Sequence, residues 1–174
     1  MKRILILFCV ASLVLVGVTN AAVKQGDTEL DLLGGWIGVN GTTDGIGDIT
    51  QWFVMGRIGY FVTNEIQVSA GVMGAFLDND FSAKLYGIGV QGKYHFMTDN
   101  NWVPYVGAQF NWVTLDNDDS IDGYMWGPVA GLRYELNEHN DFFVEYQYQM
   151  YENDIGDVIE NANMVVVGIV HQFK

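Results

Sequence analysis

Apolar and polar residues alternate with a period of two along most of the chain after residue 25. One face of each alternating segment carries Val, Ile, Tyr, Phe and Trp, and the other carries Gln, Gly, Arg, Lys and Glu. Because successive side chains of a strand point to opposite faces, this pattern predicts β-strands with one apolar face. Eight such strands are expected, near residues 28–39, 50–62, 66–77, 83–96, 102–114, 124–136, 141–151 and 162–173.

The charges in the middle of these segments all fall on the polar face, opposite the apolar one. They are Asp31, Arg57, Lys93, Arg133, Glu135 and Glu145. An Arg or Lys at the lipid midplane costs about 2–4 kcal/mol, so this sorting is expected of strands that face lipid. In lipid every backbone polar group needs a partner within the protein, which a closed barrel provides. The sequence therefore predicts an all-β, eight-stranded antiparallel transmembrane β-barrel with up-and-down meander topology.

The expected connections alternate in length. Residues 63–65, 97–101 and 137–140 are short turns, residues 40–49, 115–123 and 152–161 are longer loops, and 78–82 is a short exception. Outer-membrane barrels have short periplasmic turns and longer external loops. The sequence therefore predicts a bacterial outer-membrane location, with both chain termini in the periplasm.

The N-terminal segment has the features of a secretory signal. Lys2 and Arg3 precede an apolar run over 4–18, and 19–21 offers a small-residue cleavage site. The run is shorter than the roughly 20 residues that span a bilayer. We therefore expect a cleaved signal peptide at 1–21 and one barrel domain at 22–174. Cys9, the only cysteine, lies within this signal, so the mature chain is expected to have no disulfide and no thiol chemistry.

Acidic residues dominate the expected external loops. The formal net charge is −13, which argues against nucleic acid as a partner. The loop acids are Asp44, Asp48, Asp78, Asp80, Asp116, Asp118, Asp119, Asp122, Glu152, Asp154, Asp157 and Glu160. One interpretation is a solvated surface whose repulsion prevents association. The other is a surface that binds Ca²⁺ or Mg²⁺ through oxygen ligands and bridges to lipopolysaccharide phosphates.

One loop carries a candidate site for such a cation. Asp116, Asp118, Ser120 and Asp122 place oxygen ligands at alternate positions. An EF-hand needs glycine at its sixth position, and Ile121 stands there instead. The candidate metal ligands are therefore Asp116, Asp118 and Asp122, and apart from this divalent cation no cofactor is expected.

Aromatic residues gather near the expected ends of the lipid-facing band, where the headgroups lie. Trp52, Trp112, Tyr124 and Trp126 mark the outer boundary, and Tyr60, Tyr94, Trp102, Tyr134 and Phe142 mark the inner one. The alternative interpretation is a set of core aromatics in a soluble β-sandwich.

The interior of an eight-stranded barrel is just wide enough for side chains to fill. We expect the six polar-face charges to form an ion-pair network that plugs the lumen. The alternative is a narrow, porin-like water path for small or hydrophobic solutes, lined by loosely solvated charges. Glycines that thin the lumen wall keep that alternative open, namely Gly87, Gly89, Gly107, Gly127 and Gly131.

Three segments resemble the small eight-stranded outer-membrane barrels. These are 59–64 (GYFVTN), 127–134 (GPVAGLRY) and the ending 167–173 (VGIVHQF). That family includes the transmembrane domain of outer membrane protein A, the X-type protein and the opacity-type adhesins. For such a barrel we expect a monomer with a structural or surface-interaction role, such as envelope stability or adhesion, among outer-membrane lipid and lipopolysaccharide. The resemblance implies a terminal aromatic that the assembly machinery reads, here Phe173, although Lys174 follows it.

Two rival classes fit the residues less well. An acyltransferase or deacylase acting on outer-leaflet lipid needs a base, usually His, near the outer face. His95, His139 and His171 all fall at the expected periplasmic end, so we expect no enzyme. Residues 34–36 (GGW) match the G-x-W of lipocalins, but a lipocalin has its charges outside and its apolar residues inside.

Overall fold

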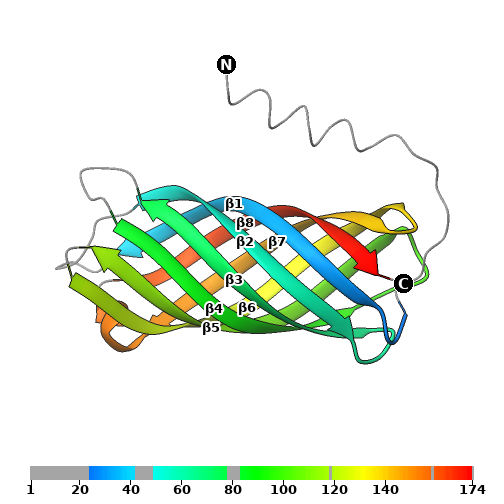
Figure 1. Cartoon of the computed structure of the whole chain (residues 1–174), viewed down its shortest axis with the longest axis horizontal. Helices are drawn as coiled ribbons and strands as arrows, with labels where there is room; N and C mark the ends of the chain where they lie inside the picture. Colours follow the sequence, from blue (N-terminus) through cyan, green and yellow to red (C-terminus); the bar gives the residue numbers. More distant parts are fainter. Residues whose placement is uncertain (1–23, 42–48, 78–82, 118, 158, 174) are drawn as a thin grey trace, which may run out of the picture.

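The computed structural model describes residues 24–41, 49–77, 83–117, 119–157 and 159–173. Its strands are β1 (Thr28–Gly41), β2 (Ile49–Phe61), β3 (Ile66–Leu77), β4 (Ala83–His95), β5 (Trp102–Asn117), β6 (Asp119–Asn137), β7 (Asn140–Glu152) and β8 (Ile159–Phe173), and a 3-10 helix, η1 (Asn153–Asp157), precedes β8. Each strand is antiparallel to the next, and β8 pairs with β1 to close the barrel (Figure 1). The predicted all-β meander barrel is confirmed. The expected signal peptide lies outside the described residues.

β1 begins and β8 ends at the same end of the barrel, with Thr28 opposite Phe173 (Figure 1). We call this the terminal end, and the opposite end the loop end. The turns at the terminal end, between β2 and β3, β4 and β5, and β6 and β7, are short. Within the described parts of the chain, no helix has the length and apolar character needed to cross a bilayer.

The two faces of the strands are those that the alternation predicts. Large apolar side chains such as Val54 and Ile88 point outward and are 64% and 63% exposed. Charged side chains in the middle of the strands point inward, where Asp31, Arg57 and Glu145 are buried. Soluble monomers rarely expose so large a continuous apolar surface, whereas the outer surface of a barrel in lipid is apolar.

The predicted loop 115–123 is wrong in large part, because β5 and β6 continue as a paired hairpin beyond the aromatic boundary. Leu115 lies opposite Ile121, and Asp116 lies opposite Ser120. The reason is that the alternation does not stop there: Leu115 is buried on the inner face while Asp116 is exposed on the outer one. Charges on the outer face end the contact with lipid without ending the strand. The predicted loop 152–161 is likewise shorter, because η1 and the start of β8 occupy most of it.

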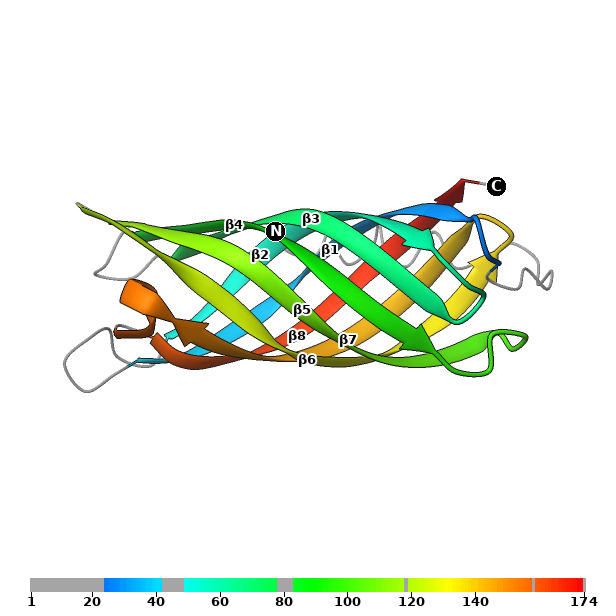
Figure 2. The same cartoon turned by 90° about the horizontal axis from the view of Figure 1, so that it is seen from below.

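The interior of the barrel has an apolar part and a charged part. Apolar side chains from all eight strands form a core that lies mainly in the loop half, including Leu33, Phe53, Leu85, Met125 and Met164, and the buried amides of Gln147 and Gln149 lie among them. Ile155 of η1 is fully buried in the same core and packs so closely on Gly123 that a Cβ there would overlap it. η1, orange in Figure 2, therefore covers part of the loop end. Among the described residues, the buried charged side chains lie in the terminal half of the interior.

Candidate functional site

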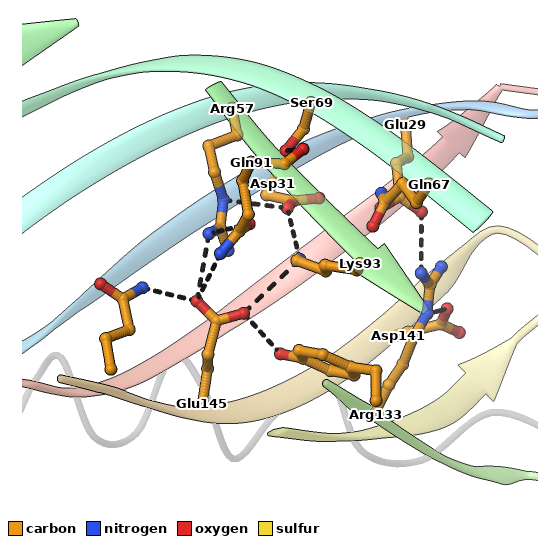
Figure 3. A network of polar contacts seen from close by, with 12 residues as sticks. Glu29, Asp31, Arg57, Gln67, Ser69, Gln91, Lys93, Arg133, Asp141 and Glu145 are labelled. Atoms are coloured by element: carbon orange, nitrogen blue, oxygen red, sulfur yellow. Dashed lines mark hydrogen bonds and ion pairs between the residues drawn. The ribbon is translucent and has the colours of Figure 1, made fainter. Parts of the chain in front are cut away.

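The buried charged side chains of the terminal half form two adjacent clusters, which we together call the ionic layer. The central cluster joins four charged residues from four strands (Figure 3). Arg57 Nε lies 3.3 Å from Asp31 Oδ2, and Arg57 Nη1 lies 3.1 Å from Glu145 Oε1. Lys93 Nζ lies 3.8 Å from Asp31 Oδ2 and 3.6 Å from Glu145 Oε2. Each cation therefore contacts both carboxylates, and all four side chains are buried.

The register of the strands explains how this cluster forms. Asp31 and Arg57 are direct cross-strand partners on β1 and β2, so their side chains share the inner face. Glu145 reaches them across the lumen from β7 and also accepts hydrogen bonds from the Tyr105 hydroxyl, at 2.9 Å, and from Gln147. These hydrogen bonds supply part of the stabilisation that buried ions lose with water.

A second cluster lies beside the first, nearer the terminal end (Figure 3). Arg133 Nη1 lies 2.8 Å from Glu29 Oε2, and Arg133 Nε pairs with Asp141. Glu29 also accepts a hydrogen bond from Gln67, and Asp141 accepts one from Gln172 at 2.9 Å. This cluster ties β1, β3, β6, β7 and β8 together at one level of the barrel.

Five of the six charges predicted for the lumen network therefore make the expected ion pairs. They are Asp31, Arg57, Lys93, Arg133 and Glu145. Glu135 is half-buried two residues beyond Arg133, with Asp141 as its backbone partner. Sequence reasoning missed Glu29 and Asp141, because it considered only charges in the middle of the strands. Their even spacing from Asp31 and Glu145 puts them on the same inner face and was the available signal.

Aromatic rings complete the surroundings of the buried cations. Lys93 Nζ lies 4.9 Å from the centre of the Tyr105 ring, and Arg57 Cζ lies 5.7 Å from that of Phe143. Arg133 Cζ lies 5.9 Å from the centre of the Phe61 ring. Cations at these distances are attracted by the negative face of the ring. The rings thus occupy lumen space and stabilise the charges at the same time.

The space left in this part of the lumen is small. A cavity of about 10 Å³ lies where the ionic layer meets the apolar core, lined in part by Arg57, Ser69, Gln91 and Asn111. A volume of this size holds about one water molecule. The inward side chains at this level are also buried, so they fill the lumen here.

The predicted girdle residues lie on the outer surface of the barrel. Trp52, Trp112, Trp126, Tyr60, Tyr94 and Trp102 are exposed, and half-buried Tyr134 contacts Trp102 with the rings tilted and their centres 4.4 Å apart. Trp36, which sequence reasoning assigned only to a lipocalin-like match, is exposed beside Trp52 with ring centres 4.2 Å apart. The two-residue alternation along β1 puts Trp36 on the apolar face, and this signal would have placed it in the girdle.

The candidate cation ligands lie on the β5–β6 hairpin. Asp116 and Asp122 are exposed on the same outer face, and Asp122 accepts a hydrogen bond from the Thr114 hydroxyl at 2.6 Å. Asp118 lies outside the described residues. Among the residues that the structure covers, no three His, Cys, Asp or Glu side chains come together to hold a metal ion. The cation site stays a prediction.

Comparison with known proteins places this geometry in a family. The family model for the outer membrane protein beta-barrel domain matches residues 10–173 of this chain. No curated protein matches the chain. Among solved structures, neisserial surface protein A has 19% identity and a TM-score of 0.65, covering 84% of this chain and 96% of its own. The N-terminal barrel of OprF from Pseudomonas aeruginosa has 20% identity and a TM-score of 0.60, covering 86% and 98%.

The attachment invasion locus protein Ail of Yersinia pestis, in complex with the heparin analogue sucrose octasulfate, has 14% identity and a TM-score of 0.55, covering 86% of this chain and 100% of its own. At these identities the solved structures share the fold with this chain. The family match covers nearly all of the chain and agrees with the lipid-type outer surface described above. The chain is therefore a transmembrane β-barrel of the bacterial outer membrane and belongs to the family of outer membrane protein beta-barrel domains.

Proposed function

We propose that this protein is a closed, non-conducting and non-enzymatic barrel with a structural or surface-interaction role in the cell envelope, such as envelope stability or adhesion. The observation that carries the proposal is the filled lumen. Mainly apolar side chains occupy its loop half, ion pairs occupy its terminal half, and a cavity between them holds about one water molecule.

The energetics of the ionic layer support a closed state over a narrow channel. A solute path through this layer requires Arg57, Lys93 and Glu145 to move apart. Separating buried partners leaves uncompensated charges at a cost of about 3–5 kcal/mol. The hydrogen bonds to Glu145 and the ring contacts of both cations add to what such a movement would break.

The lengths of the connections support an orientation with the terminal end in the periplasm. The loop end, with the β5–β6 hairpin and η1, then faces outward and presents exposed Asp116, Asp122, Glu152 and Asp154. In this orientation the girdles meet the headgroups of outer-membrane lipid and lipopolysaccharide. The exposed Phe173 at the end of β8 is then available to the assembly machinery.

Conductance of the refolded mature chain in planar bilayers tests the proposal. We expect no reproducible single-channel steps from the wild type. Arg57→Ala removes a cation from the lumen, while Lys84→Ala removes one from an exposed position on β4 and serves as the matched control.

Comparison of Arg57→Ala with Lys84→Ala distinguishes a closed barrel from a channel. Steps that appear with Arg57→Ala and not with Lys84→Ala would identify the ionic layer as the seal. Stable steps from the wild type that grow in Arg57→Ala would overturn the closed state and favour the channel for small or hydrophobic solutes.

A further inference from the structure

Two histidines meet at the terminal end of the barrel, away from the lumen. His139 lies in the turn between β6 and β7, and His171 lies on the outer face of β8. Their ring centres are 6.2 Å apart, and both side chains are exposed. His95, the remaining histidine of the sequence, is 1% exposed and faces the lumen, so it is closed to a metal ion from solution.

The backbone fixes these two residues beside each other. The N–H of Gln172, next to His171, donates to the carbonyl of His139 at 2.7 Å, and Asn140 lies opposite His171 in the ladder between β7 and β8. Asn137 tightens the turn by accepting hydrogen bonds from the His139 N–H, at 3.1 Å, and from the Asn140 side chain, at 2.9 Å. The fold therefore sets the backbone positions of the two histidines.

The ring of His171 is also oriented. Its Nδ1 lies 3.0 Å from Oδ1 of Asn140, an acceptor, so Nδ1–H is the donor in this contact, and in the neutral ring the lone pair is then on Nε2. A histidine that ligates a metal almost always donates its other N–H in this way. Phe173 packs its ring edge-on against His171 at 4.9 Å and limits the rotation of the imidazole from the other side.

The spacing of the rings fits a shared ion. With Zn–N bonds of about 2.0–2.1 Å, two imidazoles on one ion have ring centres at most about 6.4 Å apart, and about 5.2 Å apart in tetrahedral geometry. The observed 6.2 Å lies within this limit and exceeds the tetrahedral value, so a tetrahedral site requires a different rotamer of the exposed His139 side chain. Imidazole suits Zn²⁺, Cu²⁺ and Ni²⁺, whereas Ca²⁺ and Mg²⁺ prefer oxygen.

We propose that His139 and His171 form a two-histidine site for a divalent transition metal at the terminal end, with water completing the coordination. The bound ion would link the β6–β7 turn to β8, the strand that closes the barrel. This site is independent of the acidic hairpin at the loop end and of the proposed closed state of the lumen.

Zinc titration of the untagged, refolded mature chain tests the site by calorimetry. We expect one ion per chain and a rise in melting temperature with zinc, because a ligand that binds only the folded state stabilises it. His139→Gln and His171→Gln should each lose at least tenfold in affinity and lose the rise in melting temperature. Glu138→Gln, a neutralised exposed neighbour, is the matched control and should bind as the wild type does.

Two further measurements separate a shared site from binding to a single residue. Asn140→Ala removes the acceptor for His171 and should weaken zinc binding by about 10–100-fold. The electron paramagnetic resonance spectrum of bound Cu²⁺ should show two imidazole nitrogens in the wild type and one in either histidine variant. Wild-type affinity no higher than that of the double variant, or loss of binding in only one single variant, would overturn the proposal.

Discussion

At the scale of single residues, Arg57 carries a buried charge that only neighbouring side chains can compensate. It is buried, contacts both Asp31 and Glu145, and donates a hydrogen bond to Gln91. A guanidinium suits this place, since its planar fork carries five donors and keeps its charge when water is excluded. Lys93, the other cation of the cluster, offers a compact charge at longer distances of 3.6 and 3.8 Å and cannot replace that geometry.

Arg57→Ala should therefore destabilise the barrel by about 3–5 kcal/mol, because it leaves two buried carboxylates sharing only Lys93. Arg57→Lys should fall between this variant and the wild type, since it keeps the charge and loses the fork. Urea unfolding in detergent, followed by heat-modified gel mobility, measures both effects. Equal stability of Arg57→Ala and the surface control Lys84→Ala would show that the network does not contribute to folding.

Gly127 illustrates a different residue-scale constraint. It was interpreted from the sequence as thinning the lumen wall, but a Cβ at this position would overlap the backbone carbonyl oxygen of Tyr148 on β7. Gly127→Ala should therefore push β6 and β7 apart and cost about 1–3 kcal/mol. Gly92→Ala is the control, because a Cβ there meets no atom within 4 Å. The same unfolding assay compares them, and matched losses would contradict the argument from close approach.

At the scale of elements, the phase of the strands could be predicted from the sequence and their ends could not. A period of two fixes which side chains point inward, and this placed Asp31, Arg57 and Glu145 correctly. The ends of β5 and β6 depend on where backbone pairing stops, and pairing continues in water beyond the lipid band through Leu115 and Ile121.

The partners within the ionic layer could not be read from sequence either. Arg57 and Glu145 are 88 residues apart, and only closure of the barrel brings β2 and β7 to facing walls. The apolar core of the loop half was missed for a related reason. Leu33 and Met164 point inward, but the sequence does not show that they and other inward side chains pack together and fill the lumen at that level.

η1 holds the loop end through one side chain, Ile155, which is fully buried against the core. Ile155→Ala should cost about 2–5 kcal/mol, and we expect the loss to appear as local opening of η1 and of residues 115–123. Hydrogen exchange of those amides should become faster, with the amides of β1 and β8 unchanged. Asp154→Ala, on the exposed side of η1, is the control. Faster exchange throughout the barrel in Ile155→Ala would show that η1 and residues 115–123 do not open separately from the rest of the barrel.

At the scale of the whole molecule, orientation decides which surface meets the environment and which meets the periplasm. The described connections differ between the two ends: short turns at the terminal end, and a long hairpin with η1 at the loop end. This asymmetry favours insertion with the loop end outward. Cys9, the one cysteine of the sequence, lies in the expected signal peptide, so single cysteines introduced into the barrel can report on each end separately.

Ser120→Cys places a thiol on the exposed face of the hairpin, and Glu138→Cys places one on an exposed turn at the terminal end. In intact cells, a maleimide that does not cross membranes should label the first variant and not the second. Permeabilising the outer membrane should then expose the second to equal labelling, which controls for thiol reactivity. Labelling of Glu138→Cys alone in intact cells would reverse the orientation and turn the acidic hairpin toward the periplasm. In that case the surface available to an external partner would be the terminal end, with its histidine pair and short turns.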